Sequence, residues 1–435
     1  MSVLNFSAYT DCKEFQNVPA LIGKYSKIGQ VIDYGIENYI LDINGVLLAE
    51  YSEYLNLLEK TGFKKHSNND DAELSEYVKI ATFTKENLVL SITHLVKLDK
   101  TCISATYNLP LSEHLVCKED CKRTEEKTEA TTLHMPQLNS AGNSFVIQLK
   151  NGHFVIHDGG KREDAPYLLD YLEELAPKGE KPVVEAWFIS HAHDDHYGAM
   201  TQIAHDEELV NRICVEGFYF HVPGVYTTMW NGDAFVDAVL ESVPHFRDQE
   251  GQETTLYRPQ MGQRYYFCDM QIDVCLTPEL FSKDGYYYNT DINDTSIWLM
   301  NCIEGQKFLV AGDTAHTACH AAMSIFSRTY FELDVFAVFH HGINVYDYFT
   351  NYMSADTVLY TSFHLGSIYK DPTITSARIK ENAHLKEKAK ESLSYENGTV
   401  VLTFPYEVGT AEIKQTFDWR YNEGGVQMTY DYDNP

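Results

Sequence analysis

The segment 191–196 combines residue types that bind metal ions. It reads His-Ala-His-Asp-Asp-His, so three imidazoles and two carboxylates stand within six positions. The apolar run 182–190 (PVVEAWFIS) precedes it, and its β-forming residues predict a buried strand that ends at this loop. Borderline-soft ions such as zinc favour imidazole nitrogen and also accept carboxylate oxygen. We therefore interpret the segment as a metal site rather than as a surface histidine cluster.

Spacing within the segment favours two ions. Residues i and i+2 of an extended loop lie on the same side, so His191 and His193 are expected to bind one ion. The turn offsets Asp195 and His196, which are expected to face a second ion. These four residues are the first candidate ligands, and Asp195 is also a candidate catalytic residue.

Four motifs in chain order resemble the signature of the metallo-β-lactamase superfamily. The cluster 191–196 resembles its His-x-His-x-Asp-His motif. Before it, 154–160 (FVIHDGG) resembles the family's strand ending in Asp-Gly, and after it 308–314 (FLVAGDT) resembles the strand ending in Gly-Asp. The run 335–342 (VFAVFHHG) resembles the His-His-Gly ending of competence-protein-like and phosphorylcholine-esterase-like members. The resemblance spans roughly 138–404 and is specific because all four motifs occur in order.

The resemblance implies roles for further residues. Asp158 is expected to support the metal ligands by accepting a histidine hydrogen bond. Asp313 is expected to bridge both ions. His341 is expected to complete the second metal site, while His340 faces the substrate as a catalytic residue. Asp158 and Asp195 complete the catalytic set that the resemblance implies.

One ligand position stays open at this point. Many members carry another histidine ligand between the main cluster and the Gly-Asp strand, although branches that end in His-His-Gly often lack it. His205, His221 and His245 are the candidates. His221 follows the strand-like run 217–220, which places it at a strand end, so it is the preferred candidate. The alternative for His221 is a pocket wall or a structural residue.

Several residues near these motifs allow either substrate contact or plain packing. His316 and His320 have helical spacing, so they either bind metal or line an ordinary helix face. Asn293 and Ser296 either cap a loop or contact substrate. The remaining candidates lie in loops: Tyr226, Trp230, the Gly-Tyr-Tyr-Tyr run 285–288 and His364.

The elements that must position the site fall into two parts. Residues 1–116 are predicted to form an N-terminal α+β module, with a helix over 48–62 and strands at 78–84, 87–94 and 101–107. This module has no cluster of metal-binding residue types, so packing or substrate-side shaping is its expected role. Glycine at position 62 predicts a C-cap for its helix.

A charged segment separates this module from the catalytic part. Residues 117–131 (CKEDCKRTEEKTEAT) are predicted to be a linker, with a solvated helix as the alternative. Cys117 and Cys121 have no second pair nearby, so a zinc site there is not expected. Residues 132–435 alternate strand-like and helix-like runs. The α+β class follows from this alternation, and the resemblance implies a four-layer αββα sandwich for this part.

The charge of the chain restricts the partners. The 435 residues include 34 Lys and Arg against 63 Asp and Glu, which gives a formal net charge of −29. Such a surface repels polyanions, so a nucleic-acid partner is unlikely and a small-molecule substrate is expected. The sequence shows no secretory start, no membrane-spanning run and no paired cysteine framework, so a cytoplasmic location is expected. The oligomeric state is left open.

These observations favour a hydrolase with two divalent ions, zinc first and manganese or iron as alternatives. The resemblance implies that a hydroxide between the ions attacks an electrophilic centre. A small phosphoester or phosphodiester is the first substrate class. A thioester, lactone or amide would use the same site. Two other classes of protein are alternatives: a di-iron oxidoreductase and a non-catalytic metal-binding scaffold.

Overall fold

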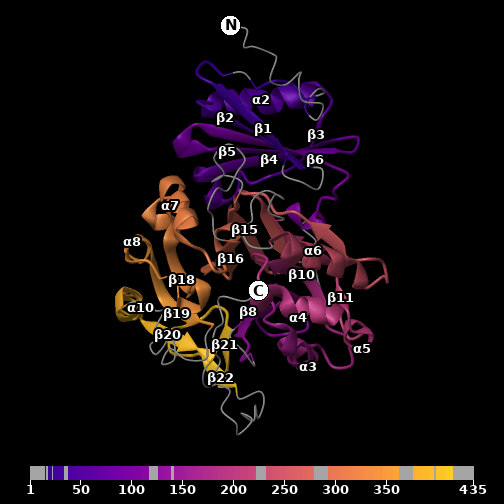
Figure 1. Cartoon of the computed structure of the whole chain (residues 1–435), viewed down its shortest axis with the longest axis vertical. Coiled ribbons are helices and arrows are strands. Elements are labelled where there is room, and N and C mark those ends of the chain that lie inside the picture. Colours follow the sequence, from indigo (N-terminus) through magenta and orange to yellow (C-terminus); the bar gives the residue numbers. More distant parts are fainter. Residues whose placement is uncertain are drawn as a thin grey trace.

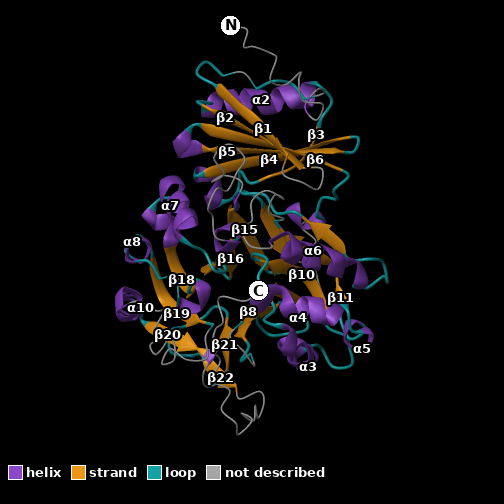
Figure 2. Cartoon of the chain, viewed as in Figure 1, coloured by secondary structure: helices purple, strands orange, loops and turns teal. Residues whose placement is uncertain are grey.

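The computed structural model of the chain describes three β-sheets with their helices (Figure 2). The described residues are 15, 18–21, 23–33, 38–116, 126–138, 142–221, 232–278, 292–343, 345–361, 376–395 and 398–414. None of the helices in these ranges is long and apolar enough to cross a membrane.

The N-terminal part is a six-stranded antiparallel sheet with one long helix. The strand order is β1-β2-β6-β5-β4-β3. The strands are β1 (Lys27–Asp33), β2 (Asn38–Asn44), β3 (Lys64–Asn68), β4 (Val78–Lys85), β5 (Leu88–Leu95) and β6 (Lys100–Tyr107). Helix α2 (Leu48–Lys60) packs Tyr51, Tyr54 and Leu58 onto one sheet face, on the side away from the rest of the chain (Figure 1).

The predicted helix and its glycine cap are confirmed. The helix ends at Lys60, and Gly62 has a φ of 92°. The Gly62 amide donates to the Glu59 carbonyl and the Phe63 amide donates to the Leu58 carbonyl, each at a distance of 3.1 Å. Glycine suits this left-handed turn because it has no Cβ to clash with the backbone.

Two further sheets pack face to face in the second part of the chain. The nine-stranded sheet has the order β13-β12-β10-β9-β8-β7-β21-β22, with β11 paired to β10, and the seven-stranded sheet runs β14-β15-β16-β17-β18-β19-β20. The first contains β7 (Thr132–Met135), β8 (Ser144–Gln148), β9 (Phe154–Asp158), β10 (Val183–Ile189), β11 (Cys214–Val215), β12 (Gly217–Phe220), β13 (Thr255–Tyr257), β21 (Thr399–Thr403) and β22 (Glu412–Lys414). The second contains β14 (Arg264–Phe267), β15 (Met270–Leu276), β16 (Trp298–Ile303), β17 (Gln306–Val310), β18 (Glu332–Ala337), β19 (Ser354–Tyr360) and β20 (Glu391–Ser394).

Helices cover the two outer faces of this pair of sheets. On the nine-stranded sheet lie α3 (Ala165–Leu175), α4 (Asp194–Ala204), α5 (Glu207–Val210) and α6 (Gly232–Ser242). On the seven-stranded sheet lie α7 (His316–Ile325), α8 (Asp347–Thr350) and α10 (Ser376–Lys388). Figure 1 shows the two helical layers on opposite sides of the sheets. The predicted α+β class and four-layer αββα sandwich are therefore confirmed.

Strand β10 shows why the sandwich forms. Phe188 and Ala186 belong to the core between the sheets, whereas Trp187 and Ile189 pack under the helices. A strand buried on both faces requires a nearly continuous apolar run, which 182–190 supplies apart from Glu185, whose carboxylate accepts from the Asn151 side chain at 2.6 Å. β10 pairs in parallel with β9 and β12, and β17, β18 and β19 are also parallel neighbours. The carboxyl ends of each parallel set therefore meet at one edge, where the motifs continue the chain.

The N-terminal sheet contacts the sandwich through buried polar groups. The Asn69 side-chain amide donates to the carbonyls of Val78 (2.7 Å) and Gly262 (2.9 Å), and its oxygen accepts from the Ile80 amide (3.1 Å). The Thr93 hydroxyl donates to the Met261 carbonyl at 3.2 Å. The predicted boundaries at 116 and 131 stay predictions, because 117–125 lie outside the described residues. Thr131, at the end of the predicted linker, is buried and its hydroxyl donates to Asp269.

We predict that Asn69→Ala lowers the free energy of unfolding by about 2 kcal/mol, because it leaves buried backbone groups without their partners. Urea unfolding measures the change. Asn68→Ala is the control, since the Asn68 side chain donates to the carboxylate of the exposed Asp70. Equal stability of the two variants would contradict the prediction.

Candidate metal centre

The loops at the strand ends bring six candidate ligands together. Asp195, His196, Asp313 and His341 form one group, and His191, His193 and Asp313 form another. Within each group the possible ligand atoms lie within 4.8 Å of one another. Asp313 belongs to both groups, so its carboxylate stands between them.

The separations within the cluster are short. His196 Nε2 lies 3.1 Å from Asp313 Oδ1, and His341 Nε2 lies 3.1 Å from Asp195 Oδ2. His191 Nε2 faces His193 Nδ1 at 2.9 Å. Candidate ligands that follow β10 in one sheet and β17 and β18 in the other therefore meet at one point of the sandwich edge.

Hydrogen bonds behind the cluster fix the protonation of three imidazoles. His196 Nδ1 donates to Asp158 Oδ2 (2.8 Å), and His341 Nδ1 donates to the Thr361 carbonyl (2.9 Å). The Ser190 hydroxyl donates to Asp158, so its oxygen accepts from His191 Nδ1 at 3.0 Å. Each Nδ1 then carries the proton, which leaves the Nε2 lone pair directed into the cluster. This is the usual arrangement of metal-binding histidines.

The donor set fits a divalent cation. His196 Nε2 and Asp313 Oδ1 lie 3.1 Å apart in a buried place, so a positive charge is needed between them. Without an ion, a proton on Nε2 supplies this charge, because the surrounding carboxylates raise the pKa of His196 well above its usual value. A divalent cation that binds the imidazole nitrogen and the carboxylate would supply the same charge. Mixed imidazole and carboxylate ligands suit zinc, manganese and iron.

Asp158 contacts the cluster through its carboxylate, and its supporting role stays a prediction. It ends β9, is fully buried and has a φ of 58°, a left-handed conformation that is costly for a residue other than glycine. Besides His196, its carboxylate accepts from the Ser190 amide (2.8 Å) and the Asn143 side chain (2.7 Å). The Trp187 indole donates to its carbonyl at 2.9 Å. Together, these contacts hold the Asp158 carboxylate in one position.

Asn143 is a supporting residue that the motifs did not indicate. Its side chain contacts Asp158, and its backbone amide donates to the Asp195 carbonyl at 3.0 Å. It thus connects the supporting carboxylate with the loop that carries the ligands. Asparagine is common just before a strand, so its position next to β8 was the one sequence signal for this supporting role.

The two histidines at the end of β18 occupy a strained turn. His340 and His341 have φ values of 50° and 53°. The turn directs His341 into the cluster, whereas His340 Nε2 lies 3.4 Å from Asp313 Oδ2 without joining either ligand group. Strain of this kind is retained where surrounding contacts hold it, most often at functional sites.

Burial and charge act against each other in the cluster. Burial opposes the charge of His196, but the carboxylates of Asp313, Asp158 and Asp195 together raise its pKa well above the usual value. Burial likewise opposes ionisation of Asp313, but His340 and His196 hold its pKa well below the usual range. Burial lowers the pKa of His191 well below its usual value. The carboxylates thus stay ionised and attract a positive charge to this place.

His221 lies apart from both ligand groups. It follows β12, next to β10, and is buried. Its Nδ1 donates to the Pro259 carbonyl at 2.7 Å, which leaves Nε2 as the acceptor. Its role as a ligand stays a prediction. His205 instead packs against His245, with ring centroids 4.8 Å apart.

The other sequence candidates have mainly structural contacts. The rings of His316 and His320 stack on Tyr348 at 5.8 and 4.6 Å. The Ser296 hydroxyl accepts from the Asp313 amide at 3.2 Å, so it caps the loop of the shared carboxylate. The Ser296 amide donates to the Asn293 carbonyl at 3.1 Å. Tyr226, Trp230, 285–288 and His364 lie outside the described residues.

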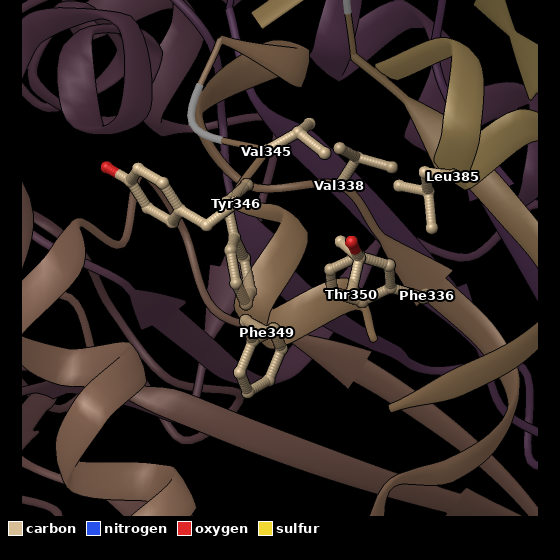
Figure 3. Close-up of a pocket in the computed structure, with 8 residues that line it drawn as sticks. Phe336, Val338, Val345, Tyr346, Phe349, Thr350 and Leu385 are labelled. Atoms are coloured by element: carbon tan, nitrogen blue, oxygen red, sulfur yellow. The ribbon is translucent and has the colours of Figure 1, made fainter. Parts of the chain in front are cut away.

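A hollow elsewhere in the molecule is unsuited to a substrate. It lies among β18, α8 and α10 and is too narrow for a water molecule (Figure 3). Thr350 is the one polar residue of its eight. The full lining is Phe336, Val338, Phe339, Val345, Tyr346, Phe349, Thr350 and Leu385.

Comparison with known proteins gives distant structural similarity. No protein-family model and no curated protein matches the chain. A metallo-β-lactamase with a HARLDQ motif from Cronobacter sakazakii shares 13% identity at a TM-score of 0.26, with 45% of this chain and 70% of that chain covered. Zn²⁺-bound PqqB from Methylobacterium extorquens shares 9% identity at a TM-score of 0.31, with coverages of 57% and 76%. A metallo-β-lactamase from Hirschia baltica shares 14% identity at a TM-score of 0.24, with coverages of 42% and 74%.

These alignments are too weak to assign a function. The αββα architecture follows from the chain's own sheets and helices, and the candidate ligands follow from their own distances.

We predict that Asp158→Asn weakens metal binding by about 10- to 100-fold, the scale for loss of a partner behind a metal ligand. Asparagine tolerates the left-handed φ, but its amide nitrogen cannot accept the donors that surround the carboxylate. A Zn²⁺ titration in competition with a chromophoric chelator measures the affinity.

Asp194→Asn is the control for the loss of one negative charge. Asp194 is adjacent to Asp195, but its carboxylate forms an ion pair with Arg162 at the surface, at a distance of 3.3 Å. An equal loss of affinity in both variants would show that only net charge matters.

Proposed function

We propose that the chain is a metal-dependent hydrolase that holds two divalent ions at the edge of its sandwich. The observation that carries the proposal is the pair of buried ligand groups that share Asp313. His191 and His193 are assigned to one ion, and Asp195, His196 and His341 to the other. Asp313 bridges them. Zinc is the preferred ion because imidazole nitrogens form most of the donor set.

Bound divalent ions supply a Lewis acid that lowers the pKa of water and attracts negative charge. The chain's own residues position the reactants. The Asp195 side chain is 24% exposed, so its carboxylate reaches the opening of the site and orients the attacking water. The His340 side chain is 18% exposed beside Asp313, on the side where a substrate oxygen would enter. Asp158 and Asn143 keep the ligand loop in place from behind.

A small phosphoester or phosphodiester is the substrate class that we propose. The net charge of −29 disfavours polyanionic partners and leaves a small molecule as the expected substrate. The His-His-Gly ending of β18 supports the phosphoester assignment through the resemblance stated above. Thioesters, lactones and amides are attacked by the same kind of nucleophile, so they are the alternatives to be tested.

We predict that Asp195→Ala lowers hydrolysis by about 10²-fold or more, the scale for removing one electrostatic group from an active site. His193→Ala should act in the same direction. Circular dichroism should show a retained fold, because both side chains are partly exposed. Steady-state rates on the metal-loaded chain measure the effect.

His205→Ala is the matched control, since this histidine ends the same helix α4 but lies with His245 outside both ligand groups. It should keep normal turnover. Full turnover of a chelator-treated, metal-free wild type would refute the mechanism.

We also predict that two equivalents of zinc or manganese co-purify and that the loaded chain prefers the phosphodiester and phosphomonoester reporters over the lactone and thioester reporters. Elemental analysis and a panel of the four reporters check this. A strongly coloured di-iron centre would indicate an oxidoreductase instead. A chain without bound metal would indicate a non-catalytic scaffold.

A further inference from the structure

Tyr395 stands where the chain passes from one sheet of the sandwich to the other. It follows β20, the edge strand of the seven-stranded sheet, and soon afterwards β21 enters the nine-stranded sheet. Its ring is fully buried in the core between the sheets. A buried tyrosine hydroxyl requires a polar partner, so the direction of this hydroxyl is informative.

The Tyr395 hydroxyl reaches two backbone carbonyls that belong to different loops. It lies 3.0 Å from the Thr361 oxygen and 3.3 Å from the Gly142 oxygen. Gly142 precedes β8 of the nine-stranded sheet, whereas Thr361 follows β19 of the seven-stranded sheet. One side chain therefore joins the two sheets at the same edge as the candidate ligands.

The Gly142 loop holds one side of the metal centre. The next residue, Asn143, donates from its amide to the Asp195 carbonyl (3.0 Å) and from its side chain to Asp158 (2.7 Å). Gly142 itself lies close to the ligand loop, since a Cβ at this position would be 3.2 Å from the Asp195 carbonyl oxygen. A shift of Gly142 would move Asp195.

The Thr361 carbonyl contacts the other side of the metal centre, at His341. It accepts from His341 Nδ1 at 2.9 Å, and the Thr361 hydroxyl lies 3.2 Å from the same nitrogen. His341 Nε2 faces Asp195 Oδ2 at 3.1 Å. The two loops joined by Tyr395 thus contact the Asp195 backbone on one side and the His341 ring on the other. The separation of these two residues determines whether a cation fits between them.

We propose that Tyr395 is a positioning residue for the metal centre and that its hydroxyl maintains the separation between Asp195 and His341. This inference rests on the proposed metal-binding function. The ring alone would fill the core in either case. The hydroxyl is what distinguishes a positioning role from packing, and the change from tyrosine to phenylalanine removes only that group.

The test compares Tyr395→Phe with the wild-type full chain. Stepwise Zn²⁺ titration against a chromophoric chelator should show about a tenfold loss of affinity for one of two ions, the lower end of the range for groups behind a metal ligand. The visible spectrum of the Co²⁺-loaded chain should change as well, because the geometry around one ion changes. A thermal melt of the metal-free variant shows whether it folds.

Tyr171→Phe is the matched control. Tyr171 is also fully buried and its hydroxyl also contacts a histidine, His134 Nδ1, at 2.7 Å, but it lies on α3 away from the cluster. It should bind both ions as tightly as the wild type. If Tyr395→Phe does not fold, Gly142→Ala tests the same junction. The added Cβ would lie 3.0 Å from Gly160 Cα, 3.1 Å from the Leu138 side chain and 3.2 Å from the Asp195 carbonyl oxygen, so the Gly142 loop must shift. The same loss of affinity is then expected.

The outcomes separate the two proposals. A wild type that binds no metal refutes the proposed function, and this inference with it. Two tight ions in the wild type, with unchanged affinities and Co²⁺ spectrum in Tyr395→Phe, refute the positioning role alone. A loss as large in Tyr171→Phe also refutes it, since packing would then explain both.

Discussion

The structure depends on the burial of carboxylates and imidazoles at one edge of the sandwich. Asp158, Asp313, His191 and His196 have essentially no exposed surface. Taking such groups out of water costs several kcal/mol for each ion unless opposite charges and hydrogen bonds compensate. The compensation is visible in the donors around Asp158 and in the imidazoles around Asp313. A cation between the two ligand groups would complete this compensation. The contacts that make the burial tolerable therefore also form the candidate metal centre.

The fold provides these contacts through the direction of its strands. β9, β10 and β12 are parallel in one sheet, and β17, β18 and β19 are parallel in the other, so six carboxyl ends are available for loops at the sandwich edge. The backbone is strained where those loops turn, at Asp158, His340 and His341. Core packing between the sheets holds the strained turns in place, because neither sheet alone supplies both ligand groups.

The sequence could indicate only those candidates that depend on residue type and local spacing. The structure places His191 and His193 near Asp313, and His341 rather than His340 near Asp195, while their role as metal ligands stays a prediction. Asn143 and Tyr395 could not be found in this way. Their partners are backbone carbonyls and residues distant in the chain, and neither leaves a pattern in the residue types. The ligand role of His221 stays a prediction, because its strand-end position is as expected but it lies outside both groups.

The C-terminal strands contribute to the site through contacts that cross between the two sheets. β20 closes one sheet and β21 enters the other, and the tyrosine between them contacts the Gly142 and Thr361 carbonyls, whose loops hydrogen-bond to Asp195 and His341. A chain that stopped before this crossing would retain every motif residue from His191 to His341. It would lack the side chain that ties the two halves of the centre together. The motifs therefore supply the candidate metal ligands, and the crossing between the later strands supplies the tyrosine that we propose maintains their separation.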